Sequence, residues 1–336
     1  MRYRRLGDSD ISVSEIALGA WLTYAGGIGR EQTEACTRAA FDAGITFFDT
    51  ANAYGHGAAE EAWGEILSAY RRDAYVLATK AFFPMSDEDS GLSAAQVEKQ
   101  LDASLRRLRT DYVDVYFCHR FDVRTPIEET IEALTASVRA GKVRVLGFSE
   151  WTLEQIRAGL GVADAERFAV SQPQYSMLWR APEAELFPLC AEEGIGNVVF
   201  SPLAQGILTG KYRPGAPPPP DSRAADAAMN GWMEGRLDDA KLAAVQRLAR
   251  VAEDAGLTLP QLALAWVLRR AEVSAAIVGA SRPEQIAANV SAVGVALTDD
   301  VLRAADAALG EVPVTTPVLA GGAEEGVMHR VAGNYA

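Results

Sequence analysis

Short apolar runs alternate along the chain with segments whose apolar residues recur at helical spacing. The eight runs cover residues 15–18, 46–49, 75–79, 113–118, 143–148, 168–171, 197–200 and 275–278. Most of them lack strict alternation of polar and apolar residues, which is typical of parallel strands buried on both faces. The pattern therefore predicts a parallel sheet whose strands are connected by helices.

Helical segments are expected between these strands. They cover residues 31–43, 93–107, 126–141, 152–160, 182–193 and 283–293, and two more, 239–255 and 259–270, precede the last strand. Gly44 is typical of a residue that follows a helix. Ser93 and Gln96 have the spacing of a capping box, and Pro126 suits a first helical turn.

Eight strands that are each followed by a helix predict an α/β fold, the closed (β/α)8 or TIM barrel, built as a single domain. The alternative is an open doubly wound sheet. That fold would place a glycine-rich dinucleotide turn after the first strand, and no G-x-G-x-x-G run occurs there. Residues 1–13 precede the first strand and are expected to form a hairpin that plugs the barrel floor.

Two segments depart from this rhythm. Residues 201–275 separate the seventh and eighth strands, and their proline-rich part, residues 214–220, is expected to be a lid-like insertion or a plain linker. After about residue 310 the chain becomes irregular. We therefore expect residues 1–310 to form the barrel and residues 311–336 to form a tail that is irregular or packed on the barrel.

The composition is that of a globular protein with a large core, with 49% hydrophobic and 23% charged residues in a chain of 336. A net charge of −13 argues against a nucleic-acid partner. The basic start of the chain is not followed by an apolar stretch, and no run of about 18 apolar residues occurs, so we expect no signal peptide and no membrane segment. The three cysteines are far apart, which favours a reducing, cytoplasmic location over a disulfide framework or a zinc site.

Four polar residues stand at or just after strand ends: Asp49, Tyr54, Lys80 and His119. In a barrel of this type the loops that follow the strands build the active site, so these side chains should converge at one mouth. Each residue alone has a simpler explanation: a helix cap for the aspartate, a solvent-directed lysine, and a histidine satisfied within the core. The joint pattern favours a functional site.

Together the four residue types indicate a site that donates a proton. An ammonium group favours the phenolate, so Lys80 would lower the pKa of Tyr54, which is about 10 when unperturbed, and make it a better acid. Asp49 would keep a buried Lys80 charged, and His119 would hydrogen-bond a substrate oxygen. The natural substrate is a carbonyl group that accepts hydride. The three histidines of the chain are too scattered to indicate a metal enzyme.

The run from Phe48 to Gly55, with Lys80 and His119 at the next two strand ends, resembles the aldo-keto reductases. The resemblance continues through Gly147-Phe148-Ser149, Ser171-Gln172, Phe200-Ser201-Pro202-Leu203 and residues 279–285, and it covers roughly residues 1–310. It implies that Tyr54 is the general acid and that His119 orients the carbonyl. Lys80 and Asp49 would be the pair that tunes the tyrosine.

The family binds NADPH in an extended conformation without a Rossmann fold, so the resemblance implies NADPH/NADP as the cofactor. Asp49 would lie near the nicotinamide ribose, Ser149 and Gln172 would hold the carboxamide, and Phe200 would stack on the ring. The other residues that would bind or line the cofactor are Trp21, Ser201, Leu203, Gln205, Gly206, Lys211, Arg223, Gly279, Ser281, Arg282, Gln285 and Asn289. Arg282 also opens the last helix, where a helix N-terminus favours an anion, and so predicts NADP over NAD.

Within the family, Leu208-Thr209-Gly210-Lys211-Tyr212, Ser222-Arg223 and residues 279–283 resemble the branch of voltage-gated potassium channel β subunits and their bacterial relatives. Glu150 stands where family members often carry an amide or a basic residue, and Ala288 where that branch often has an acidic one. The residues that would wall a substrate pocket are Trp21, Tyr24, Phe82, Phe83, Arg120 and Trp179, with ordinary packing as the alternative.

The sequence therefore predicts an NADPH-dependent oxidoreductase that reduces a small-molecule aldehyde or ketone to an alcohol. One alternative is a nicotinamide-binding regulatory subunit, like the channel β subunits, with slow turnover. Another is a barrel aldolase or isomerase that uses Lys80 as a Schiff-base amine. The intact set of four polar residues favours the reductase, because a binding role does not require it. A homo-oligomer is compatible with the sequence, but the sequence determines neither the oligomeric state nor the identity of the substrate.

Overall fold

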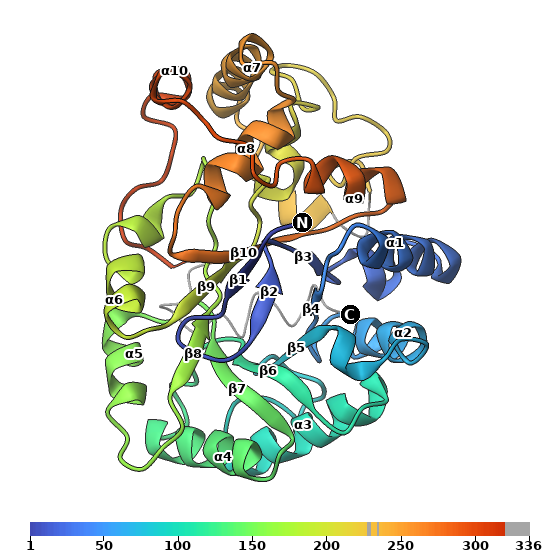
Figure 1. Cartoon of the computed structure of the whole chain (residues 1–336), viewed down its shortest axis with the longest axis vertical. Helices are drawn as coiled ribbons and strands as arrows, with labels where there is room; N and C mark the ends of the chain where they lie inside the picture. The colour runs from blue at the N-terminus through green and yellow to red at the C-terminus, as the bar shows by residue number, and fades with distance from the viewer. Residues whose placement is uncertain (227–229, 234, 320–336) are drawn as a thin grey trace.

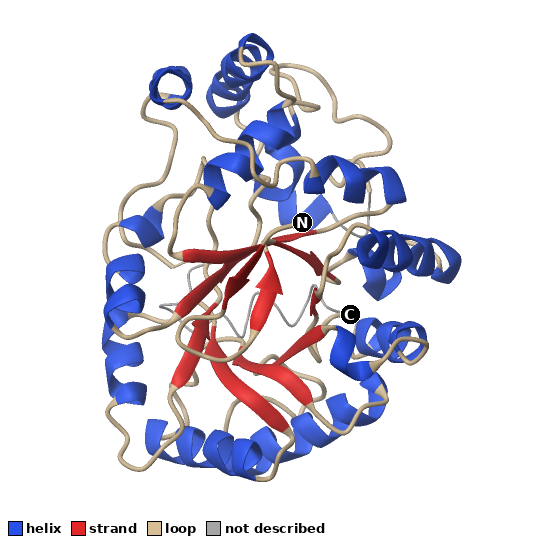
Figure 2. Cartoon of the chain, in the orientation of Figure 1, coloured by secondary structure: helices blue, strands red, loops and turns tan. Residues whose placement is uncertain are grey.

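Eight parallel strands close into a barrel, as the sequence predicts. The computed structural model describes residues 1–226, 230–233 and 235–319. The barrel strands are β3 (Ile16–Gly19), β4 (Phe47–Asp49), β5 (Val76–Ala81), β6 (Val113–Cys118), β7 (Val143–Phe148), β8 (Phe168–Ser171), β9 (Gly196–Val199) and β10 (Val273–Val278). Each pairs with the next, and β10 pairs with β3 to close the ring. Figure 2 shows these strands surrounded by helices.

The outer layer consists of helices that follow the strands. They are α1 (Arg30–Asp42), α2 (Ala58–Leu67), α3 (Ala94–Leu108), α4 (Ile127–Arg139), α5 (Leu153–Leu160), α6 (Leu186–Glu192), α7 (Asp239–Asp254), α8 (Leu259–Leu268), α9 (Pro283–Val290) and α10 (Asp299–Leu309). Short helical turns lie at Thr23–Gly27, Arg72–Ala74, Ala181–Glu183, Ala204–Thr209 and Asn230–Met233. Helices α2 and α10 add to the predicted set. No helix in the described ranges combines the length and the apolar character that a bilayer crossing requires.

Three predicted helices differ in detail from those in the structure. Ser93 is the residue before α3, but its side chain makes no capping bond, and Gln96 donates instead to the Asp89 carboxylate at 3.2 Å. The predicted capping box is therefore wrong. Pro126 has an extended backbone and precedes α4 instead of lying in its first turn. Segment 182–193 is split by non-helical backbone into a 3-10 turn and α6.

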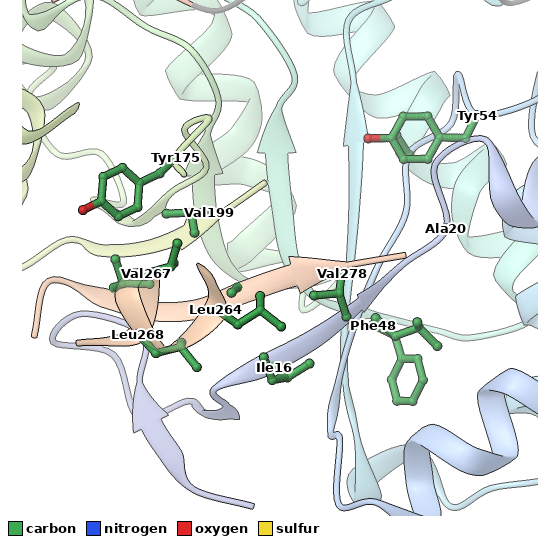
Figure 3. Close-up of a cluster of buried hydrophobic side chains, with 14 of the residues drawn as sticks. Ile16, Ala20, Phe48, Tyr54, Tyr175, Val199, Leu264, Val267, Leu268 and Val278 are labelled. Atoms are coloured by element: carbon green, nitrogen blue, oxygen red, sulfur yellow. The ribbon is translucent and has the colours of Figure 1, made fainter. Parts of the chain in front are cut away.

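Alternate residues of the strands fill the barrel interior. The inner cluster contains Ala17, Phe47, Val76, Ala78, Val115, Phe117, Val170, Val198, Ala275 and Ile277. Because successive side chains of a strand point to opposite faces, the intervening residues face the helices. Figure 3 shows this outer packing, in which Leu264 and Val267 of α8 lie against the sheet beside Ile16 and Val278.

A hairpin closes the amino-terminal end of the barrel, as predicted. Strand β1 (Tyr3–Arg5) pairs antiparallel with β2 (Ser12–Ser14), and Figure 1 shows the hairpin lying across the barrel. Leu6, Ile11 and Val13 are buried and join the inner cluster. The opposite end of the barrel is left to the loops that follow the strands.

The segment between β9 and β10 carries an exposed proline-rich stretch before α7 and α8. A lid role for it stays a prediction. Beyond α10 the chain returns to the barrel, where the Val314 N–H donates to the Leu178 carbonyl at 3.0 Å and the Arg180 N–H donates to the Val314 carbonyl at 2.7 Å. The rest of the predicted tail, residues 320–336, lies outside the described residues.

Candidate active site

The alternation that fills the barrel also brings polar side chains to its carboxyl-terminal end. Asp49, Lys80 and His119 each stand two residues after an inner-cluster residue of β4, β5 or β6 and so face the same interior. Gln172 and Phe200 stand in the same relation to β8 and β9. One periodicity therefore explains both the apolar interior of the barrel and the mainly polar layer at its carboxyl-terminal end.

Lys80 and Asp49 form a buried ion pair. The Lys80 Nζ lies 2.7 Å from Asp49 Oδ1, and the two residues are 0% and 3% exposed. The ammonium also donates to the Thr50 carbonyl at 2.7 Å and to the Tyr54 hydroxyl at 3.3 Å. Gln172 Nε2 donates to the second carboxylate oxygen of Asp49 at 2.8 Å. The Thr50 contact was not predicted, because any residue can supply a backbone carbonyl.

Tyr54 is held beside this pair as a protonated phenol. Burial raises its pKa well above the ordinary value of 10.0, and the Asp49 carboxylate raises it further, whereas Arg120 lowers it. The pKa of Tyr54 is therefore raised in the structure, and not lowered as the sequence led us to expect. Loss of solvation disfavours the phenolate, and the Asp49 charge offsets the ammonium.

His119 adds a neutral imidazole to the group. Its ring packs edge-on against Tyr54, with ring centres 5.7 Å apart, and against Phe83, with ring centres 4.7 Å apart. Burial lowers the pKa of His119 well below the ordinary 6.5, and the charges of Lys80 and Arg120 lower it further. A neutral imidazole carries one N–H donor, which suits a substrate oxygen.

Ser149 and Gln172 lie next to each other beyond β7 and β8. Ser149 Oγ donates to the Gln172 carbonyl at 2.8 Å and accepts from Arg120 at 3.3 Å. Glu150 is buried, with a backbone φ of 54°, and its carboxylate accepts the Gln174 backbone N–H at 2.7 Å. The carboxylate that departs from the family pattern thus supports the neighbouring loop.

Three basic residues, Lys211, Arg223 and Arg282, lie close together beyond β9 and β10. Burial lowers the pKa of the Lys211 ammonium, and the charges of Arg223 and Arg282 lower it further, against the opposing effect of Asp221. Lys211 also lies against Gly206, where φ is 95° and an added β-carbon would stand 3.3 Å from Lys211 Cε. Cations that repel one another in this way are typical of an anion-binding site.

The other predicted cofactor residues surround this cluster. The Arg223 guanidinium carbon lies 5.2 Å from the centre of the Trp21 ring. Gln285 Oε1 accepts the Ser281 N–H at 2.7 Å and the Arg282 N–H at 3.3 Å, so these two amides just before α9 are satisfied within the chain. The loop residues Phe200, Ser201, Leu203 and Gln205 after β9 are partly exposed. Gly279 after β10 is exposed, and Asn289 is buried in α9.

The backbone after β9 is strained. Ser201, Ala204 and Gln205 have φ values of 53°, 46° and 56°, a region that residues with a β-carbon seldom adopt. Leu22 and Glu150, in the loops after β3 and β7, also have positive φ. Such strain is typical of functional loops, and here it gathers at the end of the barrel that carries the polar residues.

The aromatic residues expected to wall a substrate pocket fall into two groups. Phe83 packs against His119, and Phe82 packs against Phe83 with ring centres 5.3 Å apart. Tyr24 packs instead against the buried tryptophan of α2, with ring centres 5.7 Å apart. Trp179 lines a separate cavity of about 110 Å³, beside residues 317–319. Ordinary packing explains the position of Tyr24, whereas Trp179 faces a cavity whose lining does not include Asp49, Tyr54, Lys80 or His119.

Comparison with known proteins agrees with the barrel fold. A sequence model of the Aldo/keto reductase family matches residues 15–309. The chain belongs to this family. The predicted family and barrel fold are thereby confirmed, and membership supports an oxidoreductase activity and the nicotinamide cofactor, NAD(P)H, that the family generally binds.

The chain is also similar to two proteins described as "Probable voltage-gated potassium channel subunit beta". The protein from Arabidopsis thaliana is 40% identical over 302 residues, which cover 88% of this chain and 92% of the relative. The protein from Oryza sativa subsp. japonica is 38% identical over 325 residues, which cover 94% and 99%. These relatives confirm the predicted resemblance to the β-subunit branch of the aldo/keto reductases.

Proposed function

We propose that this aldo/keto reductase is an NADPH-dependent enzyme that reduces aldehydes or ketones to alcohols. The observation that carries the proposal is the contact of the buried Tyr54 hydroxyl, at 3.3 Å, with an ammonium that is itself paired with Asp49. His119 packs against the same tyrosine. A bound reduced nicotinamide would supply hydride, and the side chains of the protein would handle the carbonyl oxygen.

Tyr54 donates its proton to that oxygen as negative charge develops on it. An alkoxide is a stronger base than a phenolate, so the transfer is favourable even though burial raises the pKa of Tyr54. Lys80 Nζ then stabilises the phenolate, and Asp49 keeps Lys80 charged in its buried position. The neutral His119 donates a hydrogen bond to the same oxygen and orients the carbonyl.

The basic cluster supports the choice of a phosphorylated cofactor. Lys211 and Arg223 would face the pyrophosphate, and Arg282 would bind the 2′-phosphate that distinguishes NADPH from NADH. The Arg282 side chain is 59% exposed and lies 3.8 Å from Asp221, so it is accessible and only loosely paired.

Replacing Arg282 with alanine should weaken NADPH binding about 10- to 150-fold, because hydrogen bonds to charged groups contribute about 1.5–3 kcal/mol. The loss for NADH should be less than about threefold, because NADH lacks the phosphate. Fluorescence titration with both cofactors measures this. Arg303→Ala is the control, since Arg303 is 70% exposed on α10 and pairs with Asp300. Equal losses for the two cofactors in Arg282→Ala would remove the assignment.

The rate of reduction at saturating substrate should change little between about pH 6 and about pH 9. Tyr54 has a raised pKa and stays protonated below it, whereas His119 has a lowered pKa and stays neutral above it. Neither group therefore changes its protonation state within this window. A pH–rate profile measures this, and a limb centred near neutral pH would contradict the assigned protonation states.

The similarity to proteins named as channel β subunits favours one other function, a nicotinamide-binding regulatory subunit with slow turnover. Tight NADPH binding without oxidation by a reactive aldehyde would support it. The Schiff-base alternative is less suited to the structure, because the Lys80 amine is engaged with Asp49 and Thr50. Borohydride trapping with a carbonyl substrate would reveal it.

A further inference from the structure

Arg120 is a cation of the candidate active site to which the reduction chemistry gives no role. It directly follows His119 in the loop after β6 and is half-buried. One terminal nitrogen, Nη1, donates to the His119 carbonyl at 2.5 Å and to Ser149 Oγ at 3.3 Å. The guanidinium carbon lies 5.5 Å from the centre of the Phe83 ring. These contacts hold the guanidinium beside the ring that packs against His119.

Within the described part of the chain, Arg120 lacks the carboxylate partner that three other partly buried arginines have. Arg4, Arg72 and Arg107 are also partly buried, and each contacts a carboxylate at 2.6–2.7 Å. Among residues 1–226, 230–233 and 235–319, no carboxylate lies within 4.0 Å of the Arg120 guanidinium, and its Nε is buried without a hydrogen-bond partner. Because arginines are rarely buried unless paired, this site is suited to an anion from outside the chain.

The electrostatic influence of Arg120 reaches the reacting groups. Its charge lowers the pKa of both Tyr54 and His119. Although the whole chain has a net charge of −13, Arg120 places a positive charge next to the side chains that would contact the carbonyl oxygen. Local charge of this kind raises the concentration of substrates of opposite sign.

We propose that Arg120 makes the enzyme selective for aldehydes or ketones that also carry a carboxylate group. This inference rests on the proposed reductase function and names the substrate class of the same site. With Nη1 bound to the protein, the planar guanidinium has further N–H donors that can bind a carboxylate. Since Arg120 adjoins His119 in the loop after β6, a single small molecule can contact both side chains through two polar ends.

The test compares 4-carboxybenzaldehyde with methyl 4-formylbenzoate, which share the ring and the aldehyde but differ in charge. The wild type should favour the carboxylate in kcat/KM by about tenfold or more, and Arg120→Gln should reduce that ratio at least about tenfold, mainly through KM. Arg120→Lys should keep part of the preference, because it retains the charge without the planar fork. Arg124→Gln is the matched control: Arg124 lies in the same loop and pairs with Asp122 at 3.3 Å, so the ratio should stay within about twofold.

Equal losses for the two aldehydes in Arg120→Gln would show that Arg120 only positions His119 or Ser149. A loss of NADPH affinity in that variant would place Arg120 in the cofactor site. Either result overturns the inference.

If the wild type oxidises NADPH with neither aldehyde, the proposed function fails, and calorimetric binding of both compounds to the NADP-loaded protein tests Arg120 separately. Tighter binding of the carboxylate that Arg120→Gln abolishes would support the inference. Equal binding of the two compounds to the wild type would overturn it.

Discussion

Replacing Tyr54 with phenylalanine should slow carbonyl reduction about a hundredfold to ten-thousandfold, the range that general acid catalysis contributes. The change removes the proposed proton donor and keeps the ring that packs against His119. Lys80 retains its bonds to Asp49 and Thr50 and loses only the longer contact of 3.3 Å. NADPH affinity should therefore stay within about threefold of the wild type. Single-turnover oxidation of bound NADPH measures the rate.

Tyr116→Phe is the matched control for this substitution. Tyr116 is also buried, but it lies on the outer side of β6 and its hydroxyl makes a contact of 3.4 Å with the Val97 carbonyl. This variant should keep its turnover, because Tyr116 belongs to the layer between strands and helices. An unchanged rate in Tyr54→Phe would refute the assignment of Tyr54 as general acid.

Replacing Asp49 with alanine should destabilise the fold by about 3–5 kcal/mol, the usual effect of removing one partner from a buried ion pair. Lys80 is 0% exposed, and without Asp49 its ammonium loses the carboxylate at 2.7 Å and keeps the uncharged Thr50 carbonyl and Tyr54 hydroxyl. Urea unfolding of the protein without cofactor measures the change. Asp10→Ala is the control, since Asp10 is 81% exposed and pairs with Arg144 at 3.3 Å, and it should cost less than about 1 kcal/mol.

The double variant Asp49→Leu with Lys80→Met separates stability from activity. Apolar side chains of similar size should recover most of the stability, because no charge is left buried without a partner. Turnover should stay low, because the ammonium beside Tyr54 is gone. If Asp49→Ala is no less stable than Asp10→Ala, the buried pair does not have the energetic role given to it here.

The barrel was predictable because its strands are buried on both faces and therefore form apolar runs. The same logic placed Asp49, Lys80 and His119 together, since each ends such a run and parallel strands end at one rim. The pairing of Asp49 with Lys80 also followed from charge, because a buried ammonium requires a partner. Both predictions depend on residue types and on order along the chain.

Features that depend on the three-dimensional surroundings of a residue could not be predicted from the sequence. The raised pKa of Tyr54 depends on how deeply the phenol is buried and on the offset of Lys80 by Asp49. The failure of the Ser93 capping box reflects the competing Asp89 carboxylate, a tertiary neighbour of Gln96. That the buried Arg120 Nε has no hydrogen-bond partner becomes visible only when its surroundings are known.

The most direct test of the proposed function is rapid mixing of NADPH-loaded protein with 4-nitrobenzaldehyde while the nicotinamide absorbance is followed. We expect the wild type to oxidise the bound cofactor in one phase, and Tyr54→Phe to bind NADPH equally well but to lose nearly all of that phase. Tight NADPH binding with no oxidation by the wild type would contradict the reductase function and favour the regulatory subunit.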